Sequence, residues 1–202
     1  MEGDNLPQLM VMALPNDHTS GTRPGFPTPR AMVADNDLAL GQIIEAITHS
    51  KFWKNTVVFV VEDDSQDGWD HVSAYRTAAM VISPYSKFTN AIHTAYNQPA
   101  MVRTIEQILG LPPMNIQDAI ATPMFDCFKD TPDNAPYISV KNQIPLDEMN
   151  PPLKALKGRP LWAARQSMAM NWNHPDDIQE DTLNRILWWD AKGYGKPYPK
   201  RR

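Results

Sequence analysis

Carboxylates and one imidazole follow a short apolar segment near the middle of the chain. Segment 56–61, TVVFVV, consists of apolar and β-branched residues, which predicts a strand buried on both faces of a parallel sheet. The polar side chains that come next are Glu62, Asp63, Asp64, Asp67, Asp70 and His71. Ligands bind at the carboxyl ends of strands in open α/β sheets, and carboxylate with imidazole suits divalent cations. The pattern therefore predicts metal chemistry at the end of this strand.

Two other interpretations of this acidic segment are weaker. Adjacent carboxylates repel one another, so Asp63 and Asp64 are either neutralised by a cation or form a solvated acidic loop. The segment also matches the start of an EF-hand calcium loop, but Ala74 stands where that motif needs a bidentate Glu, and a strand precedes the loop instead of a helix.

A second pair of candidate ligands lies in the turn NDHT. Asp17 and His18 follow the apolar segment Leu9–Leu14, which we interpret as another buried strand. Such a pair taken alone is more often exposed or hydrogen-bonded than metal-bound. Proximity to the first cluster would favour ligation, and mixed nitrogen and oxygen donors suit zinc, manganese or iron better than calcium.

The elements between the two clusters predict that they meet. A helical apolar stripe at 31–50 separates the strands at 9–14 and 56–61, and a right-handed crossover would place both carboxyl ends on one sheet edge. Further predicted elements are a buried strand at 78–83 and a helix at 97–110, with Pro99 in its first turn and Gly110 at its end. A last amphipathic helix is predicted at 176–192. The fold class is thus α/β, a partial, doubly wound, mostly parallel sheet with flanking helices.

Composition limits the classes of function. The chain has 202 residues and a formal net charge of −4, which provides no electrostatic footprint for nucleic acid. No apolar run is long enough to cross a bilayer, and the single Cys127 cannot form an internal disulfide. Most of the 19 prolines lie at 24–29, at 112–113 and from 123 onward. We therefore expect a compact domain over 1–125 and an irregular Pro- and Trp-rich arm over 126–202, with a terminal helix packed on the domain.

Taken together, these motifs resemble the alkaline phosphatase superfamily, in particular its phosphoesterase branch of phospholipase C-like and acid phosphatase-like enzymes. The resemblance covers about residues 9–113 and rests on LPNDHTSG, ADNDLALGQIIEAI, FWKNTVVFVVEDDSQDGWDHV, SPY and ILGLPPM. The segment 146–202, with LDEMNPPLKAL and LNRILWW, is similar to the tail of bacterial members.

The resemblance implies hydrolysis of phosphate mono- or diesters with two divalent cations, zinc in first place and manganese, iron or calcium as alternatives. Asp63 and Asp64 would bind the cation on the nucleophile side. His71, Asp17 and His18 would bind the other. The family's Ser or Thr nucleophile lies before the NDHT turn, so no catalytic nucleophile is assigned here, and the chain corresponds to the carboxyl-terminal portion of the domain.

This placement has further implications for the isolated chain. A sheet without its first strands would expose an edge, so we expect homo-oligomers or dependence on the preceding half of the domain, and little activity alone. The resemblance suggests a periplasmic or secreted parent protein. Two alternatives stay open from the residues: a metal-binding module without catalysis, and an interaction protein that uses the Trp- and Pro-rich arm.

Overall fold

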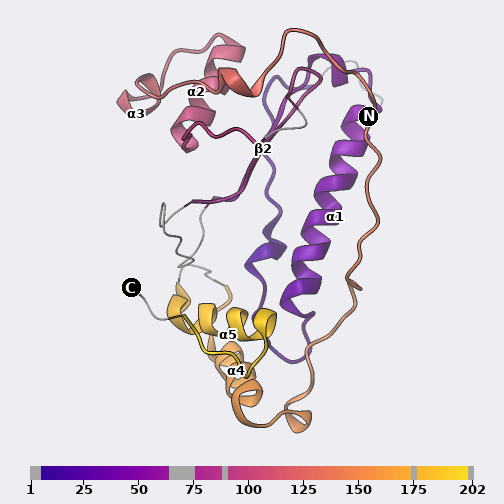
Figure 1. Ribbon diagram of the computed structural model, residues 1–202, viewed down its shortest axis with the longest axis vertical. Coiled ribbons are helices and arrows are strands. Elements are labelled where there is room, and N and C mark those ends of the chain that lie inside the picture. The colour runs from indigo at the N-terminus through magenta and orange to yellow at the C-terminus, as the bar shows by residue number, and fades with distance from the viewer. Residues whose placement is uncertain (1–5, 64–75, 88–90, 174–176, 200–202) are drawn as a thin grey trace. The chain divides into compact units, whose positions relative to one another are not determined.

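The computed structural model describes residues 6–63, 76–87, 91–173 and 177–199 (Figure 1). The predicted ligands Asp64 and His71 lie outside these residues. The chain divides into two compact units. The first contains residues 6–11, 46–63, 77–87 and 91–137, and the second contains residues 12–45, 76, 138–173 and 177–199.

The regular elements in the described residues are five α-helices, a two-stranded sheet and short 3-10 turns. In chain order they are η1 (Pro15–His18), α1 (Pro29–Thr48), η2 (Trp53–Asn55), β1 (Val58–Val61), β2 (Ala79–Ile82), α2 (Gln98–Leu109), α3 (Ile116–Ala119), η3 (Phe125–Cys127), η4 (Leu153–Ala155), α4 (Gly158–Ala169) and α5 (Glu180–Lys192). The fold is therefore a mixture of helices and strands. None of these helices is both long and apolar enough to cross a membrane within the described ranges.

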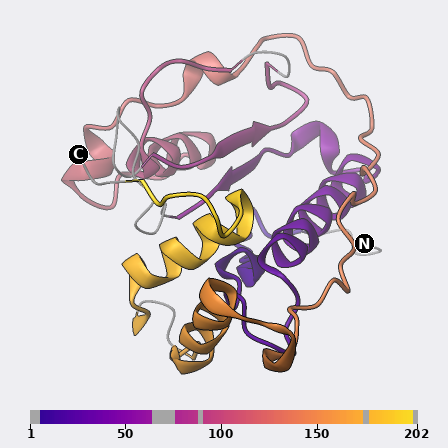
Figure 2. The same cartoon turned by 60° about the horizontal axis from the view of Figure 1, so that its bottom comes forward.

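The sheet of the first unit is an antiparallel pair. β1 and β2 pair with Val58 opposite Ile82 and Val61 opposite Ala79, and the two strands lie side by side in Figure 2. The predicted parallel, doubly wound sheet is not found among the described residues. Neither strand is buried on both faces as predicted, because two strands cannot cover one another's faces: Val61 and Met80 are 39% and 46% exposed.

The strand predicted at Leu9–Leu14 is wrong. This segment has no regular secondary structure, and Val11 is 87% exposed. A strand needs a neighbouring strand to satisfy its backbone N–H and C=O groups. In the described residues β1 and β2 pair with each other, and neither pairs with this segment. The apolar composition of this segment therefore indicated a strand, but neither β1 nor β2 provides its pairing partner.

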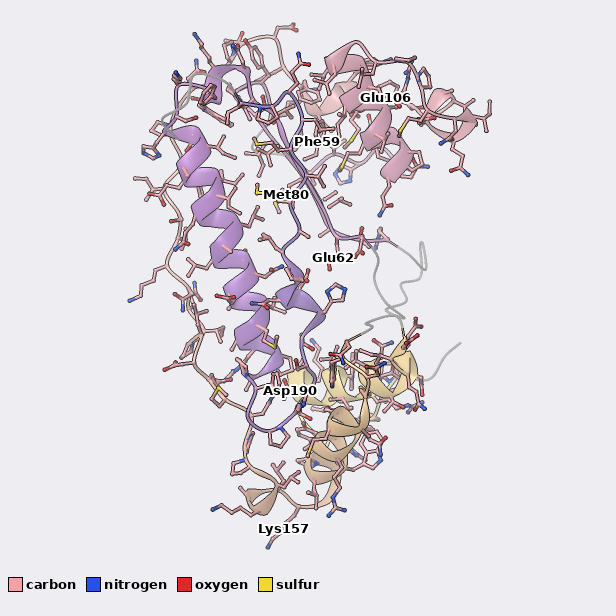
Figure 3. All side chains as sticks on the ribbon, turned by 180° about the vertical axis from the view of Figure 1, so that it is seen from behind. Phe59, Glu62, Met80, Glu106, Lys157 and Asp190 are labelled. Atoms are coloured by element: carbon pink, nitrogen blue, oxygen red, sulfur yellow. The ribbon has the colours of Figure 1, made fainter. Side chains whose placement is uncertain are left out.

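The helix predicted at 97–110 is confirmed as α2, and it covers the sheet of the first unit. Asn97 caps its N-terminus by accepting from the Ala100 amide, and Gly110 ends it in the left-handed conformation at φ 69°. Ala100 and Met101 of α2 form a core with Met124 and Cys127. Phe59, labelled in Figure 3, packs against this core and makes an edge contact with the ring of Phe128 at 6.5 Å.

The second unit is helical. The helix expected at 31–50 is confirmed as α1, which begins at Pro29, and the Thr28 hydroxyl accepts a hydrogen bond from the Ala31 amide at 3.3 Å. The terminal helix predicted at 176–192 is α5, whose Leu183 and Ile186 are buried. α5 packs against α4, as Figure 2 also shows.

Helix α4 lies in the segment that we expected to be irregular. Its first turn contains Gly158 and Pro160, which resemble chain breakers but are compatible with a helix start. Its buried face consists of Ala163, Ala164 and Ser167. Because small residues form this face, the sequence shows no stripe of large apolar side chains by which a helix is usually predicted.

Candidate functional site

The turn that carries Asp17 and His18 is a single turn of 3-10 helix, η1. Asn16 donates a hydrogen bond to the Asp35 carboxylate of α1 at 2.5 Å, and the Thr19 amide donates to the Asn16 carbonyl at 3.0 Å. The Nδ1 atom of His18 lies 3.2 Å from the Pro15 carbonyl and 3.8 Å from Asp17 Oδ1. The Asp17 and His18 side chains are 24% and 42% exposed, so this pair of donors is accessible to a ligand.

The residue after His18 has an unusual backbone. Thr19 has φ 59° and ψ −172°, a region that is almost exclusive to glycine and that costs about 1–3 kcal/mol for other residues. Thr19 is nevertheless buried, and its hydroxyl accepts from the Gly21 amide at 3.1 Å. Such strain persists only where surrounding contacts fix the conformation.

Those contacts come from the far end of the chain. The Asn150 side-chain amide donates to the carbonyls of Gly21, Arg23 and Pro27 at 3.3, 3.0 and 2.9 Å. The Ser167 hydroxyl of α4 accepts from the Thr22 amide at 3.0 Å. Loop 19–28 therefore has its conformation fixed by two buried side chains that lie more than 120 residues further along the chain.

The start of α1 is held to the same carboxyl-terminal segment by charge. Arg30 and Thr28 donate hydrogen bonds to the Glu148 carboxylate, Thr28 at 2.7 Å. The hydrogen bonds from Arg30 and Thr28 lower the pKa of Glu148 to about 2. Glu148 is thus a structural carboxylate that stays ionised over the physiological range.

Asp63 lies at the other predicted cluster, two residues after the end of β1. Its carbonyl accepts from the Gln98 side chain at 2.6 Å, and the amide of Glu62, labelled in Figure 3, donates to the Ala78 carbonyl at 3.1 Å. Asp63 is exposed. This places one carboxylate at the carboxyl end of β1, where the sequence predicted it.

The meeting of the two clusters stays a prediction. Asp17 and His18 belong to the second unit and Asp63 to the first, while Asp64 and His71 are outside the described residues. Within the described part of the chain no group of three or more His, Cys, Asp or Glu side chains could hold a metal ion. The five-residue ligand set therefore stays a prediction as well.

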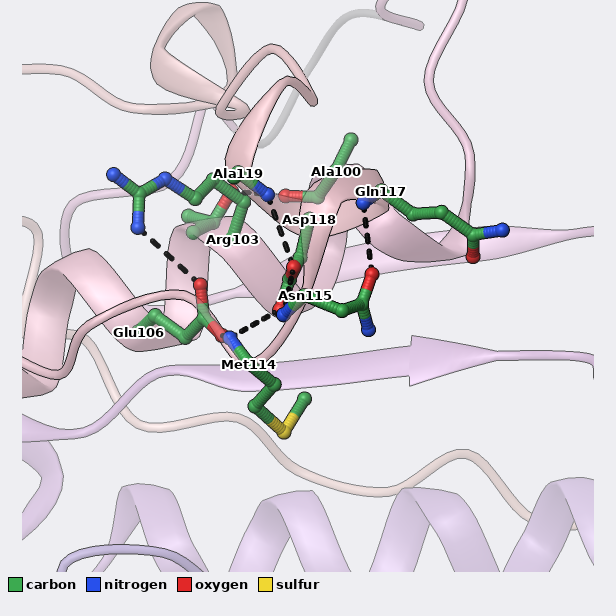
Figure 4. Close-up of polar contacts among 9 residues, drawn as sticks. Ala100, Arg103, Glu106, Met114, Asn115, Gln117, Asp118 and Ala119 are labelled. Carbon is green, nitrogen blue, oxygen red and sulfur yellow. Dashed lines mark hydrogen bonds and ion pairs between the residues drawn. The ribbon is translucent and has the colours of Figure 1, made fainter.

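Sequence reasoning missed a buried carboxylate network between α2 and α3. Asp118 accepts from the amides of Met114, Asn115 and Ala119, and Glu106 accepts from Met114 and Arg103 (Figure 4). Burial alone would raise the pKa of Asp118, but the backbone hydrogen bonds and the contact with Glu106 lower it. The Asn-x-x-Asp spacing of a capping box was the available signal. Backbone amides bind these oxygens, so the network is structural.

A tyrosine and aspartate pair lies beside a pocket of the first unit. Tyr96 and Thr94 donate hydrogen bonds to the Asp126 carboxylate. Burial first, and then Asp126, raise the pKa of Tyr96 to about 12, so its hydroxyl remains a donor. The pocket has a volume of about 560 Å³ and is lined in part by Tyr96, Asn97 and Gln117. No sequence motif marked this pair, because its members lie 30 residues apart.

These features define a chain of mixed helices and strands with one carboxylate at a strand end and a carboxylate and imidazole in a separate, firmly held turn. The chain belongs to the Phosphoesterase family, which it matches over residues 2–112, more than half of its length. Membership supports hydrolysis of phosphoric esters as the general activity. No curated protein matches the chain significantly.

Proposed function

We propose that this chain provides metal ligands for a metal-dependent phosphoesterase of the alkaline phosphatase superfamily that hydrolyses phosphate mono- or diesters. The observation that carries the proposal is the family match, which spans both the NDHT turn and the acidic segment that follows β1. The proposed ligands of two divalent cations are Asp17, His18, Asp63, Asp64 and His71. The proposal includes the parallel sheet that the sequence predicts. In such a sheet β1 would pair with a parallel strand along the edge that β2 does not occupy.

The described ligands have the donor chemistry that such cations need. Asp17 and Asp63 provide carboxylate oxygens and His18 an imidazole nitrogen, a set typical of zinc or manganese. Bound cations polarise the phosphoryl group and promote ionisation of an attacking hydroxyl or water. The turn η1 fixes the direction of Asp17 and His18, while the hydrogen bond from Gln98 to the Asp63 carbonyl fixes the backbone at the end of β1.

Cation binding tests this proposal independently of turnover. The protein is treated with EDTA, dialysed and titrated with Mn²⁺ or Zn²⁺ by calorimetry. Asp63→Asn and His18→Ala should each weaken binding by about tenfold or more, since each removes a ligand. Asp37→Asn is the matched control because Asp37 is an exposed carboxylate on α1 outside both motifs. It should bind like the wild type.

Turnover of p-nitrophenyl phosphate and bis(p-nitrophenyl) phosphate is then measured with each cation. Metal-stimulated hydrolysis that the ligand variants abolish supports the full proposal. Cation binding through these residues with no hydrolysis of either ester supports a metal-binding module instead. Failure of the wild type to bind either cation refutes the proposal.

A further inference from the structure

The loop after His18 is held in place by a small group of buried polar side chains, which we call the loop clamp: Asn150 and Ser167. Asn150 is 5% exposed and Ser167 is fully buried. Both lie beyond residue 112, where the family match ends. The clamp thus belongs to a part of the chain that the family assignment does not cover, yet it acts on a motif inside the matched region.

Asn150 fixes the path of the loop through three carbonyls. Its amide group donates to the carbonyls of Gly21, Arg23 and Pro27, and its own backbone amide donates to the Phe26 carbonyl at 2.9 Å. One side chain therefore binds carbonyl groups along seven residues of irregular backbone, and among them the Arg23 carbonyl also accepts from the Phe26 amide at 3.3 Å. No other residue type offers a short planar double donor in this position.

Ser167 fixes the start of the same loop against α4. Its hydroxyl accepts from the Thr22 amide and donates to the Ala163 carbonyl at 2.9 Å, and its carbonyl accepts from the Trp172 indole at 2.7 Å. Gly21, at φ 55°, lies so close that an added Cβ would be 2.5 Å from the Ser167 hydroxyl oxygen. Residue 21 therefore has no room for a side chain, and the glycine lets the loop approach α4 closely.

The strained residue connects this clamp to the predicted ligands. Thr19 follows His18 directly and has backbone angles that few non-glycine residues adopt. Its amide closes η1 through the Asn16 carbonyl, and its hydroxyl binds the Gly21 amide, which precedes the clamped Thr22. A relaxation of residues 21–22 would let Thr19 return to an ordinary conformation and would turn the preceding side chains.

We propose that Asn150 and Ser167 are positioning residues that hold Thr19 in its strained conformation and so direct Asp17 and His18 toward a shared cation. The inference rests on the proposed function, because it assigns the clamp to that ligand pair. Outer residues that orient metal ligands typically contribute about 10–100-fold to metal affinity. We therefore expect the loop clamp to contribute to metal affinity by a similar factor, although neither Asn150 nor Ser167 would contact the ion.

The test compares cation affinity with loop protection in the full chain. Mn²⁺ affinity is measured by calorimetry for the wild type, Asn150→Ala, Ser167→Ala and the ligand variant His18→Ala. Hydrogen exchange of the Gly21 and Thr22 amides is measured in the same proteins without metal. Asn142→Ala is the matched control, since the side-chain amide of Asn142 donates to the carbonyl of Ile144, two residues further along the chain, at 2.7 Å.

The clamp variants should show faster exchange at Thr22 and about tenfold weaker Mn²⁺ binding, while Asn142→Ala matches the wild type in both. If Asn150→Ala does not fold, as judged by circular dichroism, Ser167→Ala decides the question because alanine is favourable within α4. Unchanged Mn²⁺ affinity in a folded clamp variant overturns the inference alone. If the wild type binds no Mn²⁺, or if His18→Ala binds Mn²⁺ as tightly as the wild type, the metal role of this turn is overturned and the inference with it.

Discussion

Two turns of this protein are held by buried polar side chains that come from very different distances along the sequence. Around α3, the buried carboxylates Glu106 and Asp118 lie within eight residues of the amides that they accept from. Around the loop after His18, Asn150 and Ser167 lie 129 and 145 residues from Gly21 and Thr22. The first arrangement can form together with its helix, whereas the second requires the tertiary structure of its unit.

The chemistry of the two networks differs as well. The α3 turn uses carboxylates whose oxygens are occupied by backbone amides, so its charges serve the fold. The loop clamp is neutral, and it leaves the carboxylate of Asp17 and the imidazole of His18 partly exposed. The carboxylates of the α3 turn therefore serve the fold, whereas Asp17 and His18 on the firmly held turn have side chains that a ligand can reach.

Removal of Asn150 should have the largest effect on stability. Asn150→Ala removes the side-chain donor that three loop carbonyls share, and only the Arg23 carbonyl keeps another donor among the described residues, the Phe26 amide. We expect the free energy of unfolding to fall by about 2–3 kcal/mol. Asn142→Ala should cost about 1 kcal/mol, because it breaks one such bond. Urea denaturation at neutral pH measures both. Equal losses would show that the three contacts are not worth more than one.

The contribution of Glu148 should depend on pH. Its pKa is about 2 in the folded chain and 4.5 when unperturbed, so its stabilising effect is complete above pH 4.5 and is lost as the pH falls towards 2. Because the Arg30 side chain is 64% exposed, solvent screening reduces the effect to about 1–2 kcal/mol. Glu148→Gln should thus be less stable than the wild type at pH 6 and equal to it near pH 2. A constant difference across this range would contradict the assignment.

The local network around α3 should respond more weakly to loss of its cap. Asn115→Ala removes the side-chain acceptor of the Gln117 amide, and N-cap losses of this kind cost about 1 kcal/mol. Gln117→Ala keeps the cap and should stay within about 0.5 kcal/mol of the wild type. The comparison is made by urea denaturation. A similar loss in both variants would mean that the cap does not hold this turn.

The proposed ligands should contribute least to folding without metal. Asp17→Asn and His18→Ala change partly exposed side chains, so the free energy of unfolding should move by no more than about 0.5 kcal/mol in EDTA. The same variants should lose the stabilisation that Mn²⁺ gives to the wild type. Thermal unfolding with and without Mn²⁺ measures this difference. A large loss in EDTA would place the pair among the structural residues instead.

Local sequence patterns predicted both strands and three of the five α-helices in the described residues, α1, α2 and α5. Asn97, Pro99 and Gly110 define the ends of α2 because capping and chain-breaking are properties of a few neighbouring residues. The β-branched run before Asp63 likewise predicted β1, and the 3.6-residue periodicity predicted α1 and α5. Helix α4 escaped this reasoning, since its buried face of small residues has meaning only against the loop that packs on it.

Tertiary structure decided which strands pair and what holds the candidate site. The segment at Leu9–Leu14 has the composition of a strand, but strand formation depends on a neighbour that no local pattern specifies. The residue types of Asp17, His18 and Asp63 already indicated cation chemistry in the sequence. That Asn150 and Ser167 would hold the turn beside two of them could not be predicted from the sequence, because hydrogen bonds across more than 120 residues exist only once the chain has folded.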